Sequence, residues 1–248
     1  MKLLEFQAKR IFAEHGIPVP EGVVVRAAGD LDSLNYPVML KAQVPAGKRG
    51  KAGGIQRAVG AEQARGIAET LLGQELHGHA IEALLAEASL EVEREMYLSL
   101  LIDKDCGRPL YVGSAVGGVD IEEIAERSPE RIVRQYVDPC VGLSPYMVRF
   151  VADAMEVEDR AALGNVMAGM YAVLEEKDAT LVEINPLAET TAGLMALDAK
   201  VVLDSKADFR HQALYERLET EQAELDRSQV TPAEALAEEH DVTYVLLD

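Results

Sequence analysis

The stretch TLVEINPLAETTAGLMALDAKVV, residues 180–202, decides the fold prediction because it holds two apolar runs separated by a turn sequence. Residues 180–185 and 194–202 are predicted to be strands, with Thr-Thr-Ala-Gly between them. If the chain turns there, a symmetric register places Asn185 opposite Asp198, each five residues from the edge of the turn. The stretch therefore predicts an antiparallel strand pair with two polar side chains across from each other.

These polar residues form the first candidate site, which suits a metal ion. Glu183 and Asn185 are two residues apart on one strand, so their side chains share a face. With Asp198 they offer carboxylate and amide oxygens, the hard ligands that Mg²⁺ prefers when phosphate and water complete its shell. The alternative is that Asn185-Pro186 opens a turn and that Asp198 lies on a solvent face. The apolar neighbours of these residues favour the metal site.

The second candidate site is a glycine-rich loop, GKRGKAGG at residues 47–54, which follows an apolar strand predicted at residues 38–42. Its four glycines allow backbone N–H groups to approach an anion closely. Four cations add charge that suits phosphate oxygens: Lys41 at the end of the strand, and Lys48, Arg49 and Lys51 in the loop. The loop matches neither GxGxxG nor the P-loop pattern. From composition alone, a mobile, solvated surface loop explains it equally well.

The remaining polar groups give weaker signals. Glu87 and Glu95 bracket an acidic turn, and a carboxylate at a strand end can accept from ribose hydroxyls or lie near a metal. Taken alone, however, these two are better explained as ordinary surface glutamates. Gly117-Gly-Val-Asp-Ile-Glu122 predicts a turn that leads into an acidic helix start. The five histidines show neither metal-ligand nor catalytic-triad spacing.

Composition and charge exclude several classes of protein. The chain has 248 residues and is 48% hydrophobic, enough for a sizeable core. Its net charge of −19 repels phosphate backbones, so we expect no nucleic-acid partner. No apolar run reaches the ~18 residues of a membrane span, and the N-terminus is not typical of a signal peptide. Two cysteines are typical of a reduced protein. We therefore predict a cytoplasmic protein without a membrane partner.

Hydrophobic periodicity predicts an α+β or mixed α/β fold, because helices and strands alternate without a regular βαβ cadence. The predicted helices are residues 2–15, 61–72, 145–155 and 160–176. The predicted strands outside the 180–202 stretch are residues 23–25, 38–42, 81–86, 96–103 and 110–113.

Taken in order, these segments resemble the beta subunits of succinyl-CoA synthetases and their relatives. The resemblance covers nearly the whole chain and is most specific in Glu183-Ile-Asn-Pro-Leu187 with its spacing to Asp198. The other matching segments are Leu4-Glu-Phe-Gln-Ala-Lys9, Gly16-Ile-Pro-Val-Pro20, Lys41-Ala-Gln-Val44, Arg49-Gly-Lys-Ala-Gly-Gly54, Glu87, Glu95-Met-Tyr-Leu98, Gly117-Gly-Val-Asp-Ile-Glu122 and Lys200.

The resemblance implies an ATP-grasp fold of two interlocked subdomains. Residues 1–20 and 96–235 would form the larger body and residues 21–95 a smaller α+β nucleotide lid. Residues 236–248 would be a stub leading toward a C-terminal ligase domain that is absent from this chain. The implied activity is that of an NDP-forming acid–thiol (CoA) ligase, which uses Mg²⁺ with ATP or GTP. It would work with an alpha-type, CoA-binding partner subunit that carries a phosphohistidine.

The resemblance also assigns the site residues, while no catalytic residue of this chain is assigned because the histidine belongs to the partner. The implied nucleotide contacts are Lys41, Lys48, Arg49, Gly50, Glu87, Leu90 and Glu95, and the implied metal ligands are Asn185 and Asp198. Pro45 and Lys48 stand where the family usually has histidine and glycine, and Val116 stands for a usual glutamate. Two other functions stay open, namely a self-contained ATP-grasp carboxylate–amine ligase and a non-catalytic nucleotide-sensing or interaction subunit.

Overall fold

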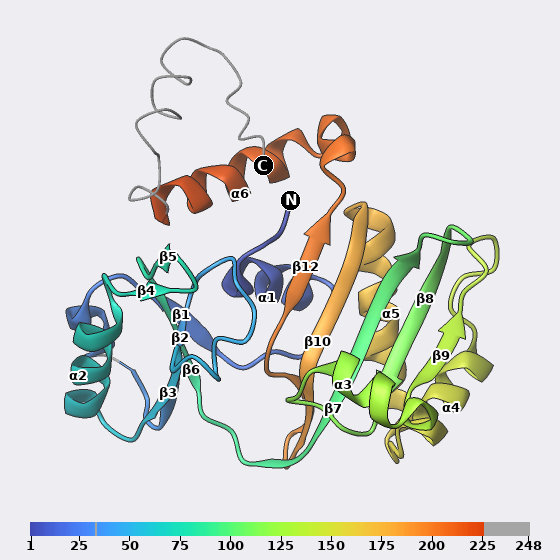
Figure 1. Cartoon of the computed structure of the whole chain (residues 1–248), viewed down its shortest axis with the longest axis horizontal. Coiled ribbons are helices and arrows are strands. Elements are labelled where there is room, and N and C mark those ends of the chain that lie inside the picture. Colours follow the sequence, from blue (N-terminus) through green and yellow to red (C-terminus); the bar gives the residue numbers. More distant parts are fainter. Residues whose placement is uncertain (33, 226–248) are drawn as a thin grey trace. The chain divides into compact units, whose positions relative to one another are not determined.

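The structure, a computed structural model, describes residues 1–32 and 34–225 (Figure 1). The chain divides into two compact units. The larger unit consists of Met1–Val23 and Glu87–Gln212, and the smaller one of Val24–Ala86 with the segment from Ala213 onward. Helices and sheets are mixed in both, which confirms the predicted fold class. The division into a lid at residues 21–95 and a body stays a prediction, and the predicted stub at residues 236–248 lies outside the described residues.

The larger unit is built on an antiparallel six-stranded sheet in the order β11-β10-β7-β8-β9, with β12 also paired to β10. Helices α4 and α5 contact this sheet, α4 along β8 and β9 and α5 along β7, β10 and β11 (Figure 1). The strands are β7 (Val92–Asp103), β8 (Arg108–Ser114), β9 (Val133–Tyr136), β10 (Ala179–Thr190), β11 (Gly193–Ala196) and β12 (Lys200–Leu203). The helices are α1 (Glu5–Glu14), α3 (Ile121–Arg127), α4 (Pro145–Ala154) and α5 (Arg160–Glu176), with short 3₁₀ turns η2 (Pro129–Arg131) and η3 (Ser205–Arg210).

Local sequence explains where these helices begin and end. Helix α5 starts after Asp159, whose carboxylate accepts from the Ala162 backbone N–H at 2.9 Å. Helix α4 has Pro145 in its first turn, where a missing N–H costs nothing. Helix α1 is followed by Gly16 at φ +72°, a left-handed conformation that glycine adopts without strain.

The smaller unit is a four-stranded sheet in the order β1-β6-β2-β3 that packs on helix α2. Helix α6 belongs to this unit from Ala213 onward, and the Arg26 guanidinium lies 2.9 Å from the Glu224 carboxylate near the end of α6. Its elements are β1 (Gly22–Val25), η1 (Ala28–Leu31), β2 (Val38–Ala42), β3 (Ile55–Ala58), α2 (Ala61–Leu71), β4 (Glu75–Leu76), β5 (His79–Ala80), β6 (Leu84–Ala88) and α6 (Gln212–Leu225).

The four predicted helices are confirmed, whereas several predicted strands have different bounds in the structure, and strands β3 and β9 were not predicted. The strand predicted at residues 96–103 begins at Val92. The strand predicted at residues 81–86 begins only at Leu84, and β10 continues past Asn185 to Thr190. The single strand predicted at residues 194–202 is broken into β11 and β12. The break has a local cause, because the Asp198 carboxylate accepts from the Ala199 N–H at 2.8 Å and takes up a backbone donor.

A buried lysine ties helix α1 to the rest of the larger unit. Lys9 pairs with Glu5 at 3.0 Å on its own helix and with Glu87, and its ammonium donates to the Leu197 carbonyl at 2.7 Å. These three charged residues are only 2–5% exposed. Buried charges are tolerated when they are paired and hydrogen-bonded, so this network, here called the Lys9 network, fixes the position of each segment it touches.

Replacing Lys9 by methionine should therefore destabilise the protein strongly. The Lys9→Met side chain keeps the volume but leaves the Glu5 and Glu87 carboxylates without their cation. We expect the free energy of unfolding, measured by urea denaturation, to fall by about 3–5 kcal/mol. Lys104→Met, at an exposed lysine of the same unit, should change it by less than about 0.5 kcal/mol. A loss at Lys9 as small as that control would show that the network does not stabilise the fold.

Two glycines of helix α5 provide a second test of packing. A Cβ at Gly169 would lie 2.6 Å from Ile17 Cγ1 and 2.7 Å from the His15 carbonyl oxygen, whereas one at Gly164 would meet Val148 at an ordinary 3.4 Å. Gly169→Ala should therefore lower the free energy of unfolding by about 1–3 kcal/mol. Gly164→Ala should leave it unchanged or raise it by up to about 1 kcal/mol, because alanine is the better helix former. Equal melting temperatures for the two variants would contradict the close approach of α5 to the His15–Ile17 segment.

Candidate functional site

The register of β10 brings the two predicted metal ligands to opposite positions. Thr190 pairs with Gly193 and Leu187 with Ala196 on β11, and Glu183 pairs with Lys200 on β12. One continuous register accounts for all three pairs, and in it Asn185 lies across from Asp198. The predicted register is therefore confirmed, although β11 and β12 are separate strands.

Asn185 lies in a bulge and does not open a turn. Between Ile184, which pairs with Leu98, and Leu187, which pairs with Met96, strand β10 has one residue more than β7. Pro186 lacks a backbone N–H and cannot take part in the ladder as a donor, which explains why the irregularity falls here. A bulge redirects the side chains beside it, and it does so here at the predicted metal ligand.

The amide of Asn185 is held on both of its polar atoms. Its Oδ1 accepts from the Gly118 N–H at 2.8 Å, and its Nδ2 donates to the Val119 carbonyl at 3.0 Å. Asn185 and Asp198 are both half-buried, and together they offer an amide oxygen and a carboxylate. Within the described part of the chain no group of three or more His, Cys, Asp or Glu could hold a metal. Two oxygen ligands fit Mg²⁺, which takes few ligands from protein and keeps water and phosphate in its shell.

A lysine and a tyrosine surround the third residue of this constellation, Glu183. Its carboxylate lies 3.3 Å from the Lys200 ammonium and accepts from the Tyr97 hydroxyl at 3.4 Å. Burial raises the pKa of Tyr97, and the negative charge of Glu183 raises it further. Tyr97 therefore stays protonated at neutral pH and acts as a hydrogen-bond donor to Glu183.

The predicted nucleoside-side residues lie in three different environments. Glu87 is 2% exposed, and its carboxylate faces Lys9 in the Lys9 network rather than solvent. Leu90 is half-buried in the connection between β6 and β7. Glu95 is exposed on β7, and its carboxylate lies against Gly118. Of these three residues, only Glu95 presents an exposed carboxylate.

In the smaller unit the glycine-rich loop folds back on itself. The Gly54 N–H donates to the Arg49 carbonyl at 2.8 Å and the Gly53 N–H to the Gly50 carbonyl at 3.1 Å. Arg49 is 7% exposed and donates through Nη1 to the Ala42 carbonyl at 2.9 Å. The loop is thus internally hydrogen-bonded, and Arg49 secures it to the end of β2.

The cations of this loop differ in exposure. Lys41, at the end of β2, is 7% exposed, whereas Lys48 is exposed and adopts a left-handed backbone at φ +59°. Gly50 is exposed as well. Lys41 and Arg49 are therefore fixed by their surroundings, while Lys48 and Gly50 lie on the surface of the loop.

Sequence reasoning missed two residues that connect segments of the larger unit, Lys9 and Arg94. Lys9 was detectable in principle, because Glu5 and Lys9 form an i,i+4 pair on a helix whose other positions are largely apolar. Arg94 left no such signal. Its guanidinium lies 3.1 Å from the Glu189 carboxylate on β10. It also donates to the Met155 and Glu156 carbonyls, at 3.1 Å and 2.9 Å, just after the C-terminal end of α4.

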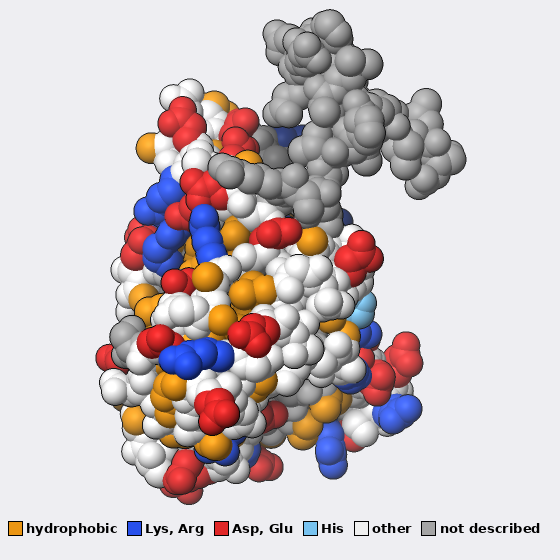
Figure 2. Space-filling view, turned by 90° about the vertical axis from the view of Figure 1, so that its left-hand side faces the viewer, with side chains coloured by type: hydrophobic (Ala, Val, Ile, Leu, Met, Phe, Trp, Pro, Cys, Tyr) orange, Lys and Arg blue, Asp and Glu red, His pale blue; other side chains and the backbone are white. Residues whose placement is uncertain are grey.

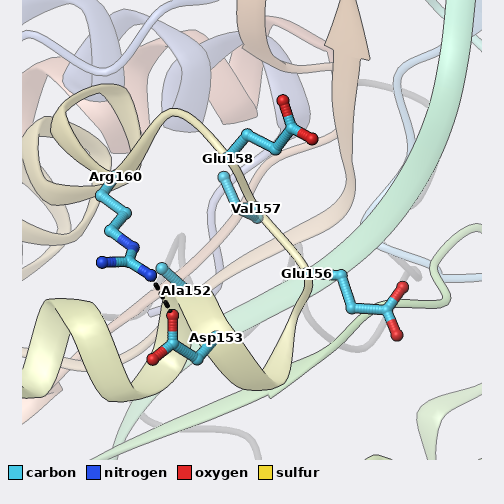
Figure 3. Close-up of a pocket in the computed structure, with 6 residues that line it drawn as sticks. All are labelled: Ala152, Asp153, Glu156, Val157, Glu158 and Arg160. Carbon is cyan, nitrogen blue, oxygen red and sulfur yellow. Dashed lines mark hydrogen bonds and ion pairs between the residues drawn. The ribbon is translucent and has the colours of Figure 1, made fainter.

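A shallow surface hollow at the corner between α4 and α5 contains none of the predicted site residues. It is lined by Ala152, Asp153, Glu156, Val157, Glu158 and Arg160 (Figure 3). Asp153 and Arg160 point toward each other in an ion pair of 2.6 Å, and both are exposed. Exposed pairs of this kind contribute little, and three carboxylates around one guanidinium do not suit an anionic nucleotide.

The surface carries charges of both signs. On the face in Figure 2, acidic and basic side chains are interspersed with small hydrophobic areas. No helix within the described residues is long and apolar enough to cross a membrane.

Comparison with known proteins identifies the family of the chain. The ATP-grasp domain family matches residues 2–189. The beta subunit of ADP-forming succinate–CoA ligase from Thioalkalivibrio sulfidiphilus is 44% identical over all of this chain and 66% of its own length. The same subunit from Methanocaldococcus jannaschii is 43% identical over 88% of this chain and 61% of its own length. This chain thus spans about two thirds of the length of these relatives, and its predicted resemblance to them is confirmed.

Solved structures share the fold at low sequence identity. The dinucleotide-forming acetyl-coenzyme A synthetase 1 of Ca. Korarchaeum cryptofilum, in complex with coenzyme A and Mg-AMPPCP, is 21% identical with a TM-score of 0.62, covering 82% of this chain and 93% of that one. ATP citrate lyase from Methanothrix soehngenii is 17% identical with a TM-score of 0.66, covering 88% of this chain and 54% of that one. Together with the match over residues 2–189, these findings establish that the chain belongs to the ATP-grasp domain family.

Proposed function

We propose that this chain is the Mg-nucleotide-binding portion of a cytoplasmic acyl-CoA synthetase of the succinate–CoA ligase type. The observation that carries the proposal is the register that sets Asn185, within the residues matched by the ATP-grasp family, opposite Asp198. The names of the relatives support the ligase class. The Mg-AMPPCP bound to a protein of the same fold supports a magnesium nucleotide as ligand.

We assign the metal, phosphate and nucleoside contacts to different residues according to their chemistry. Asn185 Oδ1 and the Asp198 carboxylate hold Mg²⁺, which neutralises phosphate charge when bound. Lys41, Lys48 and Arg49, with the backbone of Gly50, bind the phosphates of ATP. Glu87, Leu90 and Glu95 are the proposed contacts of the nucleoside, and of these Glu95 has an exposed carboxylate whereas the Glu87 carboxylate is held by Lys9.

The proposed reaction is phosphoryl transfer to a histidine of an alpha-type, CoA-binding partner. The bond between the γ-phosphorus of ATP and its bridging oxygen breaks, a P–N bond to the imidazole forms, and ADP leaves. In the reverse step the phosphoryl group passes from the phosphohistidine to ADP, which forms ATP and frees the imidazole. This chain contributes positioning and charge neutralisation rather than a covalent group of its own. A phosphohistidine segment that points toward the nucleotide site in the Korarchaeum enzyme supports this route.

Calorimetric titration with ATP, with and without Mg²⁺, tests the nucleotide site. We expect Mg²⁺-dependent binding that weakens at least about tenfold in Lys41→Ala, because a charge-assisted hydrogen bond contributes about 1.5–3 kcal/mol. Asp198→Ala should abolish the difference between titrations with and without Mg²⁺. Lys104→Ala removes an exposed lysine far along the chain and should bind as the parent does. Full affinity in Lys41→Ala would count against the proposed phosphate site.

Transfer to a partner separates the proposed enzyme from its alternatives. The chain is incubated with Mg-ATP labelled on its γ-phosphate and with the alpha subunit of a close relative. We expect an acid-labile, base-stable label on that subunit, as phosphohistidine gives, and no label when this chain is omitted. Replacing Asp198 by alanine should reduce the label at least about tenfold. Turnover without any partner would favour a self-contained ligase, and nucleotide binding without transfer would favour a sensing subunit.

A further inference from the structure

The glycine-pair loop at residues 116–119, here called the Gly117 loop, lies between two of the proposed site residues. The Gly117 N–H donates to the Glu95 carbonyl at 2.9 Å, and the Gly118 N–H donates to Asn185 Oδ1 at 2.8 Å. A Cβ at Gly117 would overlap the backbone of Met96, and one at Gly118 would overlap the Glu95 carboxylate. The loop therefore needs glycine at Gly117 in order to approach β7 this closely, and Gly118 favours glycine because its φ is +68°.

The same loop determines which way the Asn185 amide faces. Its two contacts require opposite chemistry, because the Gly118 N–H needs an acceptor and the Val119 carbonyl needs a donor. Rotating the amide by half a turn would set donor against donor at Gly118 and oxygen against oxygen at Val119. The amide oxygen is thus fixed on the side of Gly118, and it keeps a second lone pair that the N–H does not use.

We propose that the Gly117 loop is a positioning element that orients Asn185 so that its oxygen, and not its nitrogen, meets the metal ion. The inference rests on the proposed Mg-nucleotide site and deepens it, by assigning a role to a motif that the function alone does not explain. Hydrogen bonds from outside the metal shell are a general means of holding a ligand in its binding orientation.

The proposal explains why asparagine stands here, although aspartate would be the stronger ligand for Mg²⁺ by charge. An aspartate at position 185 could still accept from the Gly118 N–H, but its second oxygen would face the Val119 carbonyl oxygen. The loop would be repelled and the carboxylate would lose its fixed orientation. Asn185→Asp should therefore bind Mg²⁺ more weakly than the parent, against the expectation from charge alone.

Hydrogen exchange of the nucleotide-free chain tests the contact between the loop and Asn185. The Gly118 amide proton should exchange slowly in the parent and about tenfold faster in Asn185→Ala and in Asn185→Asp. An amide outside the loop, such as the Leu101 N–H on β7 between β10 and β8, should keep its protection and show that the variants are folded. Unchanged exchange of Gly118 in both variants would overturn the proposal.

Titration of Mg²⁺ at saturating AMPPNP then tests the consequence for the metal. Asn185→Asp and Gly118→Ala should each weaken the apparent Mg²⁺ affinity about tenfold. Gly107→Ala is the matched control, because Gly107 has nearly the same φ as Gly118, +66° against +68°, but open space around its Cβ. It shares the backbone strain of Gly118→Ala without disturbing the loop, and it should bind Mg²⁺ as the parent does.

The outcomes separate this inference from the proposed function. Mg²⁺ affinity in Asn185→Asp that equals or exceeds that of the parent would overturn the positioning role while leaving the nucleotide site intact. Equal losses in Gly118→Ala and Gly107→Ala would assign the effect to backbone strain and overturn it as well. A parent chain that binds nucleotide without any dependence on Mg²⁺ would instead remove the metal from the proposed function, and with it the ligand role of Asn185.

Discussion

The ammonium of Lys9 is the interaction on which the larger unit depends, because three separate segments meet at one buried cation. It pairs with Glu5 on α1, with Glu87 near the end of β6, and with the Leu197 carbonyl in the break between β11 and β12. Two carboxylates around one lysine are acceptable in a buried place only while every contact is kept. The position of Asp198, next to Leu197, is therefore set from the N-terminal helix, nearly 190 residues away in sequence.

The central strand β10 imposes the second constraint, and much of it could be predicted from sequence. Its pairing with the following segment is local, so a turn sequence at residues 190–193 sufficed to place Asn185 opposite Asp198. The break at residues 197–199 was not predicted, because propensity does not reveal a side chain that captures the next backbone donor. The bulge at Pro186 depends on pairing with β7, a strand more than 80 residues earlier.

The contacts that orient the site could not be predicted for a related reason. Whether Asn185 faces solvent, a metal or a loop depends on residues 117–119, and the glycine pair by itself predicted only a turn. Arg49 has the composition of a phosphate ligand, yet one of its N–H groups secures the loop to the Ala42 carbonyl. Glu87 was first explained as a surface glutamate, whereas the structure buries it against Lys9. Sequence pattern identified these residues, but only the tertiary contacts define what each side chain meets.

Several polar groups of the proposed site thus already have partners within the chain, and this has a consequence for binding. A side chain that is held by other residues loses little conformational entropy when a ligand arrives, so its contact with the ligand is more favourable. Asn185 is held in this way by backbone groups of the Gly117 loop, and Arg49 by the Ala42 carbonyl at the end of β2. Lys48 and Glu95, by contrast, are exposed. We infer that Asn185 and Arg49 each meet the proposed ligand, metal and phosphate respectively, in an orientation that the chain has already fixed.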